Sequence, residues 1–242
     1  GARYTDLGPV AHPLDQDRLN VFFPEFIGQT VNLSPRNNVD EFLQTGNVLE
    51  NSVQVRSSSD KTTLTAGFSR SDNEGIVPTN EITRTTVNFG GNAQLQNGLF
   101  VSGNINYVNV DQTGPQLGTP VSGNSTSIFE RLLFTPTNYD LANYPFINPI
   151  TGENVYYRTD QDNPYWLLET SPYTSEVDRY FGNFTLTYDI TEWLTATYRA
   201  GFNAFTDRRK SVIAASSVAN PAGEIITDNI FNEELDGTFL LT

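Results

Sequence analysis

Strict alternation of apolar and polar residues, in three pairs of neighbouring segments, constrains the fold of this chain more than any other feature. In the second pair the alternation runs over residues 87–95 and again over 99–107. The first pair spans residues 53–68 and the third spans 180–204. Because successive side chains of a β-strand point to opposite faces, each segment predicts a strand with one apolar face. The pattern therefore predicts three β-hairpins.

The residues between the paired segments predict how the strands align. A two-residue loop at Asp60-Lys61 pairs Val55 with Ala66 and places the apolar residues of the first hairpin on one face. A slip of one residue would scatter them over both faces. The second hairpin turns at residues 96–98, where the final glycine suits the positive φ of a three-residue loop. The third hairpin turns at residues 191–193.

The connections between the hairpins are much longer than the turns within them. They span about residues 69–80 and 111–177, whereas the turns hold two or three residues. Short turns at one end and long loops at the other are typical of an outer-membrane barrel, with the long loops outside the cell. Strands of roughly ten residues also suit a tilted membrane crossing. The sequence therefore predicts an all-β fold, an antiparallel transmembrane β-barrel with long extracellular loops.

A soluble β-sandwich is the alternative fold, because its strands also alternate between apolar and polar residues. Composition favours the barrel. Only 17% of the residues are charged, against about 25% in an average soluble domain, yet the mean hydropathy is still negative at −0.37. The polarity is therefore carried by Asn, Thr, Ser and Gln, as expected of a wall that faces a wide, wet lumen.

The same composition argues against several kinds of function. A formal net charge of −14 is unsuited to nucleic-acid binding, which needs a basic face. With no Cys and a single histidine, His12, the sequence offers no disulfide, thiolate metal site or histidine triad. No pair of carboxylates or other catalytic constellation stands out, so we expect neither an enzyme nor a cofactor. No apolar run approaches the roughly 20 residues of a membrane helix.

The pattern divides the chain into five parts. Because the sequence contains no Met and ends without a terminal aromatic residue, at Thr242, we expect a fragment of a larger barrel wall. A short helix is expected over Ser125–Phe134, with Ser125 or Thr126 as its N-cap. The parts are an extracellular loop or strand-edge region at 1–48, barrel hairpins at 49–110, a long extracellular loop with the helix at 111–177, a barrel hairpin at 178–207, and a loop with a possible following strand at 208–242.

Several motifs occur in an order and spacing that resemble one protein family. They include Asn37-Asn38-Val39-Asp40-Glu41-Phe42, Asp72-Asn73-Glu74-Gly75-Ile76-Val77-Pro78-Thr79-Asn80, Asn163-Pro164-Tyr165-Trp166 and Asp178-Arg179-Tyr180-Phe181-Gly182-Asn183. Over about residues 37–207 the chain resembles the SusC/RagA-like TonB-dependent transporters of the Bacteroidota outer membrane. The resemblance implies a barrel of about 22 strands with a plug inside it. It also implies energy supplied through TonB and a SusD-like surface lipoprotein as a lid. The sequence departs from the family pattern in carrying neither the plug nor a TonB box.

Two functions from different classes remain open on this basis. The first is import of oligosaccharides or peptides across the outer membrane, which the resemblance implies. The second is a structural role, in which the barrel belongs to a larger surface complex and imports nothing. A soluble carbohydrate-binding β-sandwich is a distant third.

Two sets of residues are candidates for contact with a substrate. Aromatic rings of the long loop could stack on sugars or peptides, although packing within the loop or against the lid is the favoured interpretation; they are Tyr156, Tyr157, Tyr165 and Trp166. Polar residues of the lumen face could tune what passes, or be ordinary wall residues; they are Arg56, Asn104, Asn106 and Arg199. Asp160 and Asp162 are spaced like loop calcium ligands but lack the glycine and distant glutamate of an EF-hand, so a solvated turn is favoured.

Overall fold

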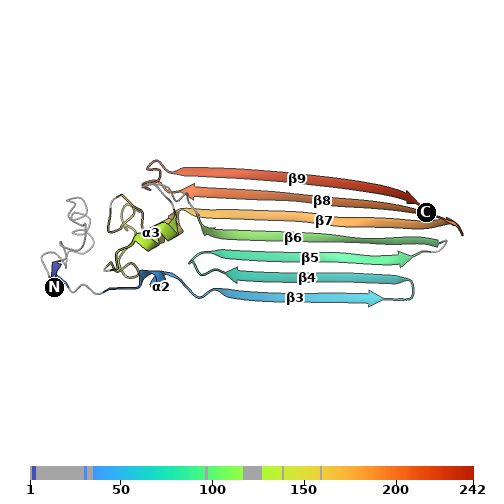
Figure 1. Cartoon of the computed structure of the whole chain (residues 1–242), viewed down its shortest axis with the longest axis horizontal. Coiled ribbons are helices and arrows are strands. Elements are labelled where there is room, and N and C mark those ends of the chain that lie inside the picture. The colour runs from blue at the N-terminus through green and yellow to red at the C-terminus, as the bar shows by residue number, and fades with distance from the viewer. Residues whose placement is uncertain are drawn as a thin grey trace.

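A single antiparallel sheet of seven strands dominates the computed structural model, which describes residues 2–3, 30–31, 35–95, 98–116, 127–137, 139–158 and 160–242. The strands follow one another in sequence order across the sheet (Figure 1). They are β3 (Asn47–Ser58), β4 (Thr62–Glu74), β5 (Glu81–Gln94), β6 (Leu99–Pro115), β7 (Pro172–Thr191), β8 (Leu194–Ile213) and β9 (Glu224–Leu241). A separate short pair joins β1 (Ala2–Arg3) to β2 (Thr30–Val31).

The hairpin registers predicted from the alternation are confirmed. Val55 pairs with Ala66, and the backbone N–H of Ser59 donates to the carbonyl of Thr62 at 2.7 Å to close the first turn. In the second hairpin Gly98 has a φ of +79°, as a three-residue loop requires. The third hairpin runs from β7 into β8 with one register irregularity between residues 189 and 191.

One face of the sheet is apolar across all seven strands. Paired residues form rows that cross the sheet, and one row comprises Val55, Ala66, Phe89, Ile105, Gly182, Phe202 and Leu235. Phe89 and Leu235 are 56% and 74% exposed, and no second sheet packs on this face among the described residues. We call this side the apolar face and the opposite side the polar face. A β-sandwich would bury such a face against a second sheet, so the exposed rows favour lipid as its partner.

The apolar face has a defined height, which we call the apolar band. On β6 its outward positions run from Leu99 to Tyr107, a span of nine residues that matches the roughly 9–11 residues of a tilted transmembrane strand. The next outward row is polar on six strands, where it comprises Asn51, Arg70, Thr85, Asn109, Asp178 and Thr206, and on β9 it ends at Phe231. At this boundary the ring of Tyr107 lies 4.8 Å from that of Tyr180, and the Tyr107 hydroxyl donates to Asp178 at 2.7 Å. An aromatic ring with a polar tip suits a membrane interface.

Several strands extend further toward the long loops than the alternation predicts. The connection after the first hairpin is only residues 75–80, and the long connection is shortened because β6 reaches Pro115 and β7 begins at Pro172. Beyond the apolar band the outward positions of β4 to β7 are polar, so the alternation ends while the backbone pairing continues. Ion pairs such as those of Arg208 with Glu176 and Asp178 join neighbouring strands there.

The segment 208–242 also differs from the sequence expectation. The basic residues Arg208, Arg209 and Lys210 lie within β8 instead of a loop, and β9 forms a full strand of 18 residues. Along β9 the outward positions include Gly237 and Glu233 between the apolar residues, so the alternation of this strand is broken. This interruption explains why the strand was only a possibility from sequence.

Three short helices gather at the end of the sheet opposite the hairpin turns (Figure 1). They are α2 (Asn38–Phe42), α3 (Ile128–Phe134) and α4 (Pro164–Thr170). Helix α3 starts later than expected, because its N-cap is Ser127, whose hydroxyl accepts from the N–H of Glu130 at 3.4 Å. The two caps proposed from sequence, Ser125 and Thr126, lie outside the described residues. Helix α2 falls in a region where only loop and strand edges were expected.

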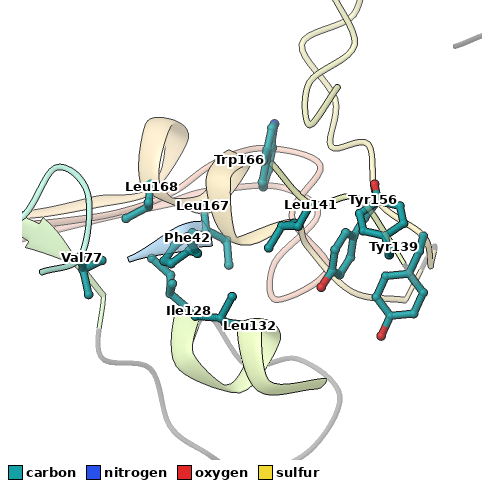
Figure 2. Close-up of a cluster of buried hydrophobic side chains, with 11 residues drawn as sticks. Phe42, Val77, Ile128, Leu132, Tyr139, Leu141, Tyr156, Trp166, Leu167 and Leu168 are labelled. Carbon is teal, nitrogen blue, oxygen red and sulfur yellow. The ribbon is translucent and has the colours of Figure 1, made fainter. Parts of the chain in front are cut away.

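The hydrophobic core of the described chain lies in this loop region and not in the sheet. It joins side chains from all three helices and from the segments between them (Figure 2). The buried members are Phe42, Val77, Ile128, Leu132, Tyr139, Leu141, Tyr156, Tyr157, Trp166, Leu167 and Leu168. We call helices α2, α3 and α4, with residues 139–158 and 214–218, the loop platform. Among the described residues, no helix is long and apolar enough to span a membrane.

Candidate functional site

Three of the four aromatic residues proposed as ligand contacts are buried inside the loop platform. Tyr156, Tyr157 and Trp166 are only 4%, 6% and 1% exposed (Tyr156 and Trp166 are labelled in Figure 2). Their polar atoms bond within the platform: the Trp166 indole N–H donates to the carbonyl of Gly152 at 3.0 Å, and the Tyr157 hydroxyl donates to that of Phe134 at 3.1 Å. All three rings belong to the platform core, which is the packing role that the sequence analysis favoured for them.

The fourth aromatic residue, Tyr165, is half-buried. Its ring lies 4.8 Å from that of Phe42 and 5.8 Å from that of Phe146, which ties α4 to α2. Burial raises the pKa of Tyr165 and also that of Tyr157, because an ionised phenol is poorly solvated inside the platform. Both rings pack within the platform, and the Tyr157 hydroxyl also donates a hydrogen bond.

The two aspartates considered as calcium ligands have separate roles within the protein. Asp160 accepts from the guanidinium of Arg158, with Nε at 2.7 Å. Asp162 is fully buried and accepts from the hydroxyl of Ser217 at 2.7 Å and from the backbone N–H of Val218 at 3.1 Å. Burial raises the pKa of Asp162, because its charge is desolvated. Asp162 therefore anchors the β8–β9 connection, at Ser217 and Val218, to the segment that precedes α4. No group of three or more His, Asp or Glu residues gathers as a metal site among the described residues.

Three of the four residues proposed to face the lumen meet on the polar face. Arg56, Asn104 and Asn106 line a shallow hollow of about 430 Å³, together with Thr63, Thr65, Asn88 and Asn92. Glycine makes room in it, because a Cβ on Gly67 would lie 2.6 Å from the side-chain nitrogen of Asn88. Arg199 lies on the same face of β8, opposite Thr185 and Thr238. The polar face around the hollow and Arg199 therefore offers amide, hydroxyl and guanidinium groups.

A second polar-face cluster was not proposed from the sequence. The Arg179 guanidinium donates from Nε to the amide oxygen of Asn203 at 2.9 Å, and Asn203 donates to Glu234 at 3.3 Å. The guanidinium also lies 5.1 Å from the centre of the Phe181 ring, within range of a cation–π interaction. Arg179 and Phe181 belong to the motif Asp178-Arg179-Tyr180-Phe181-Gly182-Asn183. In an alternating strand they lie on the face opposite to that of Tyr180. Applying the alternation there would have assigned both to the polar face.

The fold and the two faces define a class of structure. An antiparallel sheet with an apolar band of membrane height, a polar opposite face and long loops at one end is a segment of transmembrane β-barrel wall. Searches against family models and curated proteins found no match.

Solved structures do resemble the chain. The RagAB peptide importer in its "open-open" state matches 98% of this chain with a TM-score of 0.72 and 15% identity, and the "closed-closed" state matches 98% with 0.71 and 15%. The RagAB peptide transporter matches 93% with 0.70 and 14%. This chain covers only 27%, 27% and 26% of those chains, about a quarter of their length. At this identity the likeness shows a shared fold, and it confirms the barrel wall expected from the motifs.

Proposed function

We propose that this chain is a wall segment of a TonB-dependent outer-membrane importer of oligosaccharides or peptides. The observation that supports this proposal most directly is the fold match, which covers 98% of the chain and so includes the sheet and the loop platform. The matched structures belong to a peptide importer. The apolar band supplies a surface for lipid, and the polar face supplies a surface for a water-filled or plugged lumen.

The edges of the sheet support a larger barrel. Strands β3 and β9 are the outermost strands, each paired on one side only among the described residues. In lipid each unpaired backbone group costs several kcal/mol, so a membrane-spanning sheet needs both edges closed. The proposal therefore places further strands of the same barrel beside β3 and β9.

The loop platform is the proposed contact surface for a SusD-like surface lipoprotein. It lies at the long-loop end of the sheet, which faces outward in a barrel of this kind (Figure 1). Its buried aromatic core gives the loops a fixed shape, and a fixed shape lowers the entropy cost of binding a partner. The coupling to TonB is proposed to run through a plug inside the barrel.

Uptake by intact cells tests the proposal. Cells with the full-length protein, cells lacking it and cells lacking TonB are offered labelled peptides and labelled oligosaccharides. Import requires that uptake of one class falls in both deletion strains and returns when the missing gene is restored. Normal uptake of both classes, with loss of a surface assembly, would instead support the structural role. A protein that stays soluble without detergent, and shows no heat-modifiable migration, would exclude the membrane barrel altogether.

A further inference from the structure

The polar face changes character along the height of the barrel wall. Around Arg56 and Asn104 it carries amides, hydroxyls and glycine. Closer to the loop platform, strands β6, β7 and β8 place apolar side chains on this same face: Val108, Val110, Val177, Phe181 and Phe205. Apolar residues are unexpected on a face that meets only water, so the outer part of the polar face is suited to a ligand with apolar groups.

Arg179 stands among these apolar residues in a fixed position. Its Nε is held by Asn203 at 2.9 Å and its guanidinium lies over the ring of Phe181. The side chain is exposed, and none of the ion pairs among the described residues involves it. A guanidinium restrained through Nε still has two terminal nitrogens, whose parallel N–H groups can bind a carboxylate with two hydrogen bonds.

An opposite charge lies nearby on the same face. Glu234 accepts from Asn203 at 3.3 Å and is otherwise exposed, two strands away from Arg179. Neighbouring strands are about 4.8 Å apart, so the two charges are separated by roughly 10 Å. An extended peptide rises about 3.3–3.6 Å per residue, so some three residues span that separation. A neutral oligosaccharide would leave both charges without an ionic partner.

We propose that the surface formed by Arg179, Phe181, Asn203, Phe205 and Glu234 binds peptide cargo, with Arg179 holding a carboxylate. Asn203 is a positioning residue that orients the guanidinium toward the lumen. The carboxylate comes from the peptide C-terminus or from an acidic side chain, and the apolar rings take neighbouring side chains. This inference rests on the proposed importer and selects peptides over oligosaccharides as its substrate class.

Binding to the purified full-length protein in detergent tests the inference without any requirement for transport. The probes are the tripeptide Ala-Phe-Val, its C-terminal amide, the amidated peptide Ala-Phe-Asp, and the neutral sugar maltohexaose. Either peptide with a carboxylate should bind more tightly than the Ala-Phe-Val amide, and maltohexaose should bind weakest. Arg179→Gln should weaken binding of the two carboxylate peptides by roughly tenfold to a hundredfold, as expected for a lost charge-assisted hydrogen bond.

Matched variants separate recognition from folding. Lys210→Gln removes the same charge from β8 on the outward side and should leave peptide affinity unchanged. Arg179→Lys should restore part of the affinity, and Asn203→Leu should weaken binding of the carboxylate peptides more than that of the amide. Heat-modifiable migration of each variant confirms that the barrel has folded.

Three results would overturn the inference. They are equal affinity for Ala-Phe-Val and its amide, an unchanged affinity in folded Arg179→Gln, and tighter binding of maltohexaose than of either carboxylate peptide. Failure of the proposed importer looks different, because cells would then show no TonB-dependent uptake even where the purified protein binds peptide.

Discussion

Replacing Phe184 with Asp should block assembly of the sheet in a bilayer, because Phe184 lies at mid-height of the apolar band. It pairs with Gly103, the fifth of the nine β6 residues from Leu99 to Tyr107. Its ring also covers that glycine, since a Cβ on Gly103 would lie 3.4 Å from a ring carbon. A charge at the midplane costs less for an acidic residue than the roughly 2–4 kcal/mol of Arg or Lys. Losing the apolar ring adds about 1.5–3 kcal/mol, so we expect a total of about 3–5 kcal/mol.

The neighbouring residue provides the control. Thr185 points to the polar face and pairs directly with Arg199, so Thr185→Asp introduces the same charge beside a cation. An opposite-charge pair across strands contributes about 0.2–1 kcal/mol, and we expect this variant to fold normally. Folding of the full-length protein is measured from its heat-modifiable band and from urea titration in lipid vesicles. If the two substitutions destabilised the protein equally, the assignment of the faces would be refuted.

Further predictions concern the loop platform and the edge of the band. Trp166→Ala should cost the platform about 3–5 kcal/mol and speed proteolysis of the loops, while the heat-modifiable band persists; unchanged proteolysis would contradict the burial. Asp162→Asn should keep the contact with the β8–β9 connection, because an amide oxygen still accepts from the N–H of Val218. Asp162→Ala should destabilise this contact by about 1–3 kcal/mol, which faster hydrogen exchange at Val218 would show. Because the pKa of Asp162 is raised, protonation favours the folded platform, and this stability is lost as pH rises through the raised pKa. Opening of the platform, measured by exchange corrected for intrinsic rates, should therefore become rarer as pH falls from the raised pKa toward the ordinary value of 3.8, but not in Asp162→Asn. Tyr107→Phe removes the hydrogen bond to Asp178 and should cost about 1 kcal/mol in urea titration.

The strands inside the membrane were predictable because lipid enforces a rule on each residue. Val55, Phe89 and Ile105 must all point outward, so only one register satisfies the alternation. Outside the apolar band that rule no longer applies. The strand ends near Glu74 and Pro172 are held by backbone pairing and by ion pairs, which leave no period in the sequence. Strand β9 was uncertain because Glu233 and Gly237 occupy outward positions.

The candidate site was harder to predict because residue type does not reveal burial. Tyr156 and Trp166 are aromatic residues that could stack on a ligand. Their place in a packed core depends instead on contacts with distant segments such as α2 and α3. The binding role of Arg179 could not be predicted from the sequence for another reason. Its face followed from the alternation, whereas its restraint by Asn203 comes from a strand 24 residues away in sequence. The face of the sheet on which a residue lies therefore follows from the local sequence, whereas the orientation of its functional group depends on tertiary contacts.

The two parts of the chain depend on different environments for their stability. The loop platform buries its own apolar side chains, including Phe42, Leu132 and Leu167, so water is a suitable solvent for it. The sheet leaves residues such as Phe89 and Leu235 exposed on its apolar face, and burial of that face requires lipid or detergent. A substitution in the platform core should therefore change loop order while the barrel persists, whereas one in the apolar band should prevent assembly of both. This difference allows effects on cargo or partner binding to be separated from effects on membrane insertion.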